Sequence, residues 1–193
     1  MPSPPHIALR LIMPLRRSIT PLRQCFQRRN FSESSDSVLA TCLRDIARSG
    51  ARVEELELPK STDLVCRQLM CEHVGDACAC RLALALERVP RLRRLDLSSN
   101  QLRALPDAVF ALRELATLDL RQNRLTTLSP DVQQLAQLET LDVSHNQLQT
   151  LPVQQLETLS KLRTLRVAGN AELLKVIETT AMSEQLRAKL VLE

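Results

Sequence analysis

A pattern of leucine and asparagine residues recurs in the second half of the chain and constrains the fold more than any other feature. Its copies begin at Leu92, Leu115, Leu138 and Leu162, so the spacings are 23, 23 and 24 residues. Three copies follow L-x-x-L-x-[LV]-x-x-N-x-L-x-x-L, and the fourth follows it as far as Asn170. A fixed period of this length predicts a stack of similar structural units.

The spacing within one copy predicts a short strand followed by a turn. Leu95 and Leu97 alternate along the chain, as a strand with one buried face requires. An asparagine follows each strand where the chain must turn; these residues are Asn100, Asn123, Asn146 and Asn170. One such coil has two open flat sides, and stacking buries both, so the copies are expected to fold as one array.

This pattern resembles the leucine-rich repeat. The resemblance implies an α/β solenoid, a horseshoe with short parallel β-strands on its concave face and helical caps at both ends. In that family the repeat asparagine bonds backbone groups inside the coil, so the four asparagines are expected to form a buried ladder. The leucine-rich repeats are assigned to residues 53–182.

The first repeat is longer than the others. Val53 to Leu58 reads VEELEL, the strand half of a repeat, and the next strand begins 39 residues later at Leu92. The segment between them ends in a helical pattern, with Asp76 as a candidate cap and Pro90 as its end. It resembles the longer repeat of ribonuclease-inhibitor-type proteins.

The segments that flank the repeats are expected to close the array. Residues 32–52 predict an N-terminal capping helix that begins at Ser37, ends at Gly50 and places Val38, Leu39, Cys42, Leu43 and Ile46 on one face. Residues 183–193 predict a closing helix with Leu186, Leu190 and Val191. A solenoid needs such atypical ends because its terminal coils would otherwise expose their core.

Residues 1–31 differ in composition from the rest of the chain. They contain six arginines and no acid, and the first acid is Glu33. An arginine-rich, acid-free segment with Ser, Thr and interspersed apolar residues is typical of a mitochondrial transit peptide. Arg29-Asn30-Phe31-Ser32 resembles a matrix-protease cleavage site, and a cut before or after Phe31 would fit. The alternative is a disordered basic tail that binds acidic surfaces or lipids.

The net charge of +4 arises from this first segment. Without its six arginines the chain has 20 basic residues against 22 acidic ones. The basic pI is therefore no evidence for a nucleic-acid-binding surface. No run of 18 apolar residues is present, so no membrane span is expected.

Catalytic and metal-binding signatures are missing from the sequence. It contains no G-x-S-x-G and no H-E-x-x-H, and its three isolated glycines cannot form a phosphate-binding loop. A metal site is conceivable from Cys66, Cys71, His73, Cys78 and Cys80, but they lack the paired C-x2-C spacing of zinc modules. Reduced thiols are the preferred interpretation, a functional disulfide is the other, and neither an enzyme nor a cofactor is expected.

The concave face is the predicted binding surface. Side chains between the framework leucines should stand in columns about 4.8 Å apart. The expected binding residues are Arg94, Thr117 and Thr140 in one column, Asp96, Asp119, Asp142 and Arg166 in a second, and Ser98, Arg121 and Ser144 in a third. Glu57 would extend the second column. The carboxylates of this column repel one another, and a partner with a basic helix or patch would relieve that repulsion. Alternatively, these aspartates are only tolerated, since Leu-Asp-Leu is common in this repeat family.

Together these features predict a non-enzymatic protein–protein interaction module. With its leader, the chain would be a scaffold or assembly factor in the mitochondrion, in the matrix, as a monomer or part of a hetero-complex. In length, leader and repeats it resembles the leucine-rich-repeat factors associated with ATP synthase and complex I assembly. The alternative is a cytosolic signalling regulator that binds a small GTPase or a phosphatase.

Overall fold

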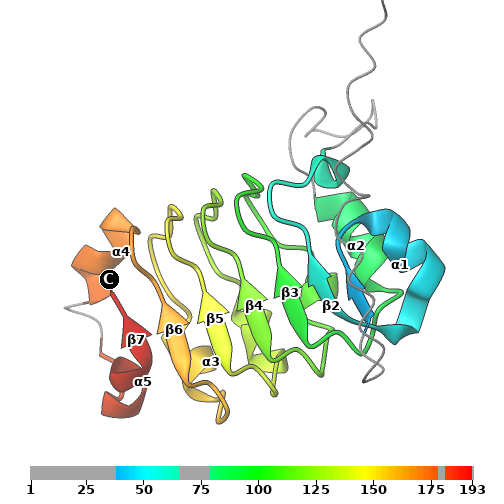
Figure 1. Ribbon diagram of the computed structural model, residues 1–193. Coiled ribbons are helices and arrows are strands. Elements are labelled where there is room, and N and C mark those ends of the chain that lie inside the picture. Colours follow the sequence, from blue (N-terminus) through cyan, green and yellow to red (C-terminus); the bar gives the residue numbers. More distant parts are fainter. Residues whose placement is uncertain (1–37, 66–78, 178–180, 193) are drawn as a thin grey trace, which may run out of the picture. The chain divides into compact units, whose positions relative to one another are not determined.

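The computed structural model describes residues 38–65, 79–177 and 181–192 of the chain (Figure 1). The chain divides into two units, Met1–Phe31 and Ser32–Glu193, and every described residue belongs to the second. The expected transit peptide, the Ser37 and Asp76 caps, and most members of the conceivable metal site (Cys66, Cys71, His73 and Cys78) therefore lie outside the described residues.

One parallel sheet runs through the whole second unit. Its seven strands follow one another in sequence order (Figure 1). They are β1 (Val38–Ala40), β2 (Val53–Glu57), β3 (Arg94–Asp96), β4 (Thr117–Asp119), β5 (Thr140–Asp142), β6 (Thr164–Arg166) and β7 (Leu190–Val191). Each strand belongs to one coil, so this arrangement is the α/β solenoid that the repeats predict.

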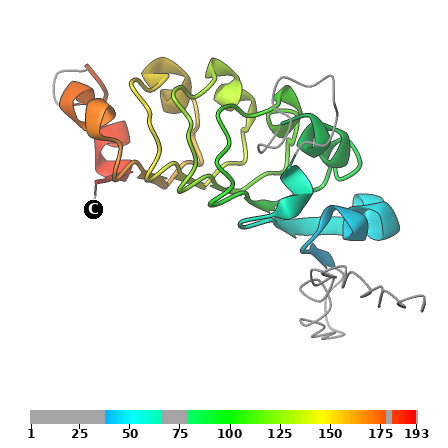
Figure 2. The same ribbon diagram turned by 90° about the horizontal axis from the view of Figure 1, so that it is seen from above.

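The return arcs lie on the side opposite the strands (Figure 2). In the coils of 23 and 24 residues they hold one short helical segment each: η4 (Asp107–Val109), η5 (Pro130–Gln134) or α3 (Val153–Glu157). Ser129 caps η5 with its side chain and Pro130 follows at the first helical position, which fixes where that turn begins.

The interval between β2 and β3 contains more helix than the shorter arcs. It includes η3 (Thr62–Leu64) and α2 (Ala79–Leu86), whose inner face buries Leu82, Ala85 and Leu86. The expected helical pattern before Pro90 is thus present from Ala79 onward. Its likeness to ribonuclease-inhibitor repeats stays a prediction.

The core is aliphatic along its full length. The framework leucines Leu95, Leu118, Leu141 and Leu165 are all 0% exposed. Phe110 is the one aromatic side chain among the buried described residues, at 2% exposure. Burial of each leucine removes apolar surface from water, so stacking of neighbouring coils is the main stabilising contribution.

The N-terminal end differs from the expected helix. Val38–Ala40 forms β1, which pairs with β2, and helix α1 (Leu43–Ser49) begins later, followed by η2 (Gly50–Arg52). Leu39 is consequently 49% exposed instead of lying on a buried helix face. The physical reason is the open edge of β2, whose backbone groups need hydrogen-bonding partners that a strand supplies and a helix does not. Gly50 ends α1 with φ of 50°, as expected for a helix terminus.

The C-terminal end shows the same substitution of a strand for part of a helix. Helix α4 (Ala171–Ile177) occupies the arc of the fourth copy, and α5 (Glu184–Lys189) follows, capped by the Ser183 side chain. Leu186 is buried on α5, as expected. Leu190 and Val191 instead form β7, which pairs with the outer edge of β6.

Candidate functional site

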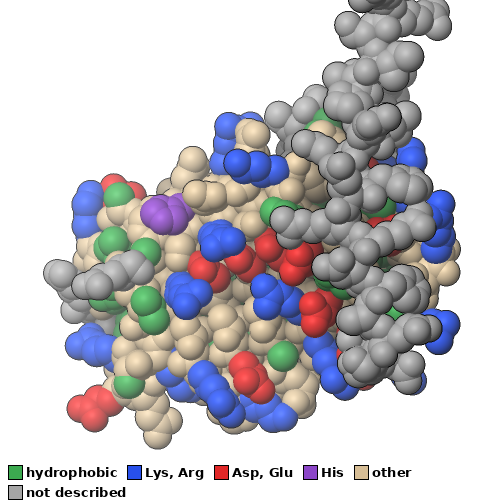
Figure 3. Space-filling view, viewed as in Figure 1, with side chains coloured by type: hydrophobic (Ala, Val, Ile, Leu, Met, Phe, Trp, Pro, Cys, Tyr) green, Lys and Arg blue, Asp and Glu red, His purple; other side chains and the backbone are tan. Residues whose placement is uncertain are grey.

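Parallel pairing in equal register aligns the outward side chains of the sheet into columns. Arg94, Thr117, Thr140 and Thr164 are register partners from β3 to β6. Asp96, Asp119, Asp142 and Arg166 form the next column, and Glu57 of β2 precedes Asp96. The structure therefore brings together the residues that the sequence assigned to one face (Figure 3).

The asparagine that follows each strand lies inside the coil. The Asn123 amide nitrogen donates to the Leu97 carbonyl of the preceding coil at 2.9 Å and to its own coil at Leu120, also at 2.9 Å. Its oxygen accepts from the backbone N–H groups of Asn100 and Leu102. Asn100, Asn146 and Asn170 bond neighbouring coils in related ways. This ladder satisfies backbone groups that would otherwise be buried without a partner.

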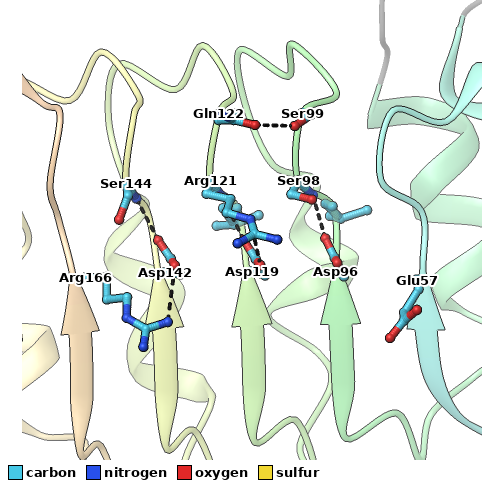
Figure 4. Close-up of polar contacts among 12 residues, drawn as sticks. Glu57, Asp96, Ser98, Ser99, Asp119, Arg121, Gln122, Asp142, Ser144 and Arg166 are labelled. Atoms are coloured by element: carbon cyan, nitrogen blue, oxygen red, sulfur yellow. Dashed lines mark hydrogen bonds and ion pairs between the residues drawn. The ribbon is translucent and has the colours of Figure 1, made fainter.

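Each aspartate of the acidic column is tied to its own coil. The Oδ1 atom accepts a hydrogen bond from the backbone N–H two residues later, at 2.8 Å for Asp96 and at 3.0 Å for both Asp119 and Asp142 (Figure 4). This contact holds the carboxylate at the carboxyl end of its strand and directs the second oxygen along the face.

Arginines of the chain itself lie beside most of these carboxylates. Arg94 Nε lies 3.7 Å from Glu57 Oε1, Arg121 Nε lies 3.3 Å from Asp119 Oδ2, and Arg166 Nη1 lies 3.7 Å from Asp142 Oδ2. The three arginine side chains are 51–52% exposed. Acidic and basic groups therefore lie side by side across the face (Figure 3), and the chain's own arginines offset part of the expected self-repulsion of the acidic column.

Three side chains expected to point outward are buried. Ser98 is 3% exposed, Asp142 is 6% exposed and Ser144 is 7% exposed. Asp142 is covered because the longer Arg166 side chain of the next coil lies against it. The two serines have short side chains, and Arg121, which lies between them in the third column, has a longer one. These residues shape the face from below and contribute little exposed surface to it.

Asp119, at the centre of the acidic column, has a raised pKa. Burial raises the pKa of Asp119, and the charges of Asp96 and Asp142 raise it further, while the Arg121 backbone N–H and guanidinium oppose the shift. The charged form of Asp119 is therefore disfavoured where the side chain lies in the folded protein.

A hollow of about 600 Å³ lies where the strands end, and we call it the strand-end hollow. Its lining includes the exposed side chains of Lys60, Arg121, His145 and Arg166. The buried residues Ser98, Asp142, Ser144 and Ala168 lie below them. Its remaining lining residues are Pro59, Ser99 and Gln122.

A residue with a left-handed backbone lies three positions after the end of each strand from β2 to β6 and shapes this hollow. Lys60, Ser99, Gln122, His145 and Gly169 have φ between 49° and 70° at equivalent positions of successive coils. In the last of these coils a Cβ on Gly169 would lie 2.4 Å from His145 Nδ1, so glycine leaves the space that the imidazole occupies. This conformation turns each coil out of the sheet and opens the face there.

Sequence reasoning missed several residues of this surface. Glu55 is the register partner of Arg94 and so belongs to the first column. Lys60 and His145 line the strand-end hollow, and neither was among the expected binding residues. The available signal was their position immediately before the turn residue of each coil.

Three further observations concern metal binding, the cysteines and membrane spans. Among residues 38–65, 79–177 and 181–192, no group of three or more His, Cys, Asp or Glu side chains is placed to hold a metal ion. Cys42 is buried and Cys80 is partly exposed. No helix in the described part of the chain is long and apolar enough to cross a bilayer.

Comparison with known proteins identifies the repeat family. Residues 44–188 match the family described as leucine-rich repeat region. No curated protein sequence matches the chain. A solved leucine-rich repeat protein of Leptospira interrogans is 25% identical over 62% of this chain and 32% of that protein, with a TM-score of 0.45, so the chain spans about a third of its length. Since the family match runs from α1 to α5, the chain belongs to the leucine-rich repeat proteins.

Proposed function

We propose that the chain is a non-enzymatic scaffold that binds another protein through the concave face of its sheet, and that it acts in the mitochondrion. Leucine-rich repeat folds are typically interaction modules without catalytic activity, which supports the first part. The observation that carries it is the face itself, where aligned polar side chains from β2 to β6 stand on a continuous buried framework. A rigid sheet of this kind presents its side chains at fixed spacing, so a partner can bind without ordering a loop.

The basic partner expected from the sequence fits one end of this face best. Glu55, Glu57 and Asp96 lie on β2 and β3 and form the acidic end. Arg94 pairs with Glu57, and among the described residues neither Glu55 nor Asp96 has an ion-pair partner. Two carboxylates thus remain to receive a lysine or arginine of the partner, whereas Asp119 and Asp142 already have cations beside them.

The mitochondrial part of the proposal depends on residues 1–31. Their six arginines and lack of acids support a targeting role, and the composition changes at the boundary between the two units of the chain. The same repeats would serve a cytosolic regulator of a GTPase or phosphatase equally well. Location therefore has to be measured separately from binding.

Proximity labelling in cells tests both parts. The full chain is expected to label mitochondrial matrix proteins, and a variant without residues 1–31 is expected to label cytosolic ones. Glu55→Lys with Asp96→Lys should remove the partner from the labelled set, while the matched control Asp107→Lys, on the convex side at η4, should retain it. Unchanged location after the deletion would exclude the targeting role, and unchanged partners in the double variant would exclude the acidic end.

A further inference from the structure

The strand-end hollow differs in charge from the acidic end of the same face. Its charged lining residues are Lys60, Arg121, Arg166 and Asp142, so three cations accompany one acid. Asp142 is 6% exposed and both its oxygens are engaged, by the Ser144 N–H and by Arg166. The accessible charge in the hollow is therefore positive, and it fits an anionic group.

The two arginines are held in place and still have donors to offer. Arg121 is anchored by Asp119, and Arg166 by Asp142, through contacts of 3.3 and 3.7 Å. Each guanidinium has five N–H donors, so one carboxylate neighbour leaves others available to a second. Because about half of each side chain is exposed, those donors are accessible from the concave side (Figure 4).

The floor beneath the arginines is made of small side chains. Ser98, Ser144 and Ala168 are 3%, 7% and 9% exposed, and their small side chains leave room beside those of Arg121 and Arg166. His145 stands at the border of the hollow, in the space left by Gly169. A hollow bordered by cationic side chains and floored by serines can take the carboxylate of a short acidic side chain without displacing the backbone.

We infer that the strand-end hollow binds an aspartate or glutamate carboxylate of an acidic segment in the protein partner, through Arg121 and Arg166 with Lys60 at the margin. This inference rests on the proposed interaction function and adds a second, oppositely charged contact to it. A partner would place a basic group over β2 and β3 and an acidic group over β4 to β6. Such an arrangement would set the direction in which the partner lies across the strands.

The test is an NMR titration of the full chain with an acetylated and amidated hexaglutamate peptide. The Arg121 and Arg166 Nε–H signals and the His145 ring signals are expected to shift, with no shift of the exposed Arg113. Arg121→Gln should raise the Kd roughly fivefold, as loss of an exposed ion pair predicts. Hexaglutamine and hexalysine peptides should leave these signals unchanged.

Arg166→Gln removes the cation beside the buried Asp142, so that variant is informative only if its spectrum remains folded. Lys60→Gln is the second variant, because Lys60 is exposed and forms no ion pair among the described residues. It should weaken binding less than Arg121→Gln, and Arg113→Gln should leave the Kd unchanged. Equal shifts from hexaglutamine, or an unchanged Kd in both Arg121→Gln and Lys60→Gln, would overturn the inference.

Failure here is distinguishable from failure of the proposed function. The titration uses a peptide and pure protein, and it reads the hollow without any cellular partner. If the protein binds a partner in cells but does not bind hexaglutamate, the proposed scaffold function stands and only the carboxylate subsite is excluded.

Discussion

The asparagine ladder has a member in each of four coils and the acidic column has an aspartate in three of them, and the two sets of residues have different roles. The ladder joins coils: Asn123 donates to Leu97 in the preceding coil and accepts from Asn100 and Leu102 there. The backbone bonds of the aspartates stay within one coil: each is donated by the N–H two residues later. Polar residues inside the stack therefore stabilise it, while those on its face determine what it presents to a partner.

The largest expected effect is loss of a ladder residue. Asn123→Ala leaves the buried backbone N–H groups of Asn100 and Leu102 without this acceptor, while the Leu97 and Leu120 carbonyls keep the amides of Asn100 and Asn146. Each buried group left unsatisfied costs about 1–3 kcal/mol, so the free energy of unfolding in urea should fall by about 3 kcal/mol or more.

Asp96→Ala, which loses one such bond at the surface, is the comparison variant. It should lower the free energy of unfolding by about 0.5–1.5 kcal/mol. Equal losses in the two variants would remove the distinction between ladder and column.

A smaller loss is expected at the turn that ends β6. Gly169→Ala places a side chain at φ of 70° and directs its Cβ at the His145 ring. The left-handed backbone costs about 1–2 kcal/mol for a residue with a Cβ, and His145 is exposed and can turn away. Urea unfolding should therefore show a loss of that size, largely unchanged when His145→Ala is added. Full recovery in the double variant would show that the steric contact, and not the backbone, sets the cost.

The pH dependence of the acidic column provides a finer test. Because the pKa of Asp119 is raised in the folded state, its protonated form favours folding below the ordinary aspartate pKa, and this contribution is lost as the pH rises through the folded value. Asp119→Asn keeps an oxygen for the Arg121 N–H without the charge. At pH 7 it should be more stable than the parent chain by about 0.5 kcal/mol, and the difference should shrink toward pH 3. A variant that is less stable at pH 7 would show that the Arg121 pair outweighs burial.

The smallest effect on stability is expected at the acidic end. Glu55→Gln changes a partly exposed residue with no ion pair among the described residues, so the free energy of unfolding should move by less than about 0.5 kcal/mol. Partner recovery in a pull-down should nevertheless fall. Stability loss without loss of binding would assign Glu55 to the framework.

The sequence predicts the repeated part of this fold well because the spacing of the repeat directly determines how the coils align. Equal coil lengths set equal register, so the alignment of Arg94 with Thr117 and of Asp96 with Asp119 follows from the spacing alone. The burial of Asp142 does not follow, because it depends on Arg166 reaching back from the next coil. The pairing of Arg121 with Asp119 likewise depends on a side-chain conformation.

The ends of the stack were less predictable. Val38–Ala40 and Leu190–Val191 have apolar patterns short enough to fit a helix or a strand, and no repeat constrains them. Their strands form because β2 and β6 would otherwise leave an edge of backbone groups without partners. That cause lies in the neighbouring coil and not in the segments themselves.

Site-specific photo-cross-linking tests the central claim, that the concave face binds another protein, most directly. A photoreactive residue at Thr117 or Thr140 lies in the first column of the face, and one at the exposed Gln133 of η5 lies on the opposite side. The same partner band should form from both concave positions and be absent from Gln133. Cross-links of equal yield from Gln133, or from Gln133 alone, would contradict the account.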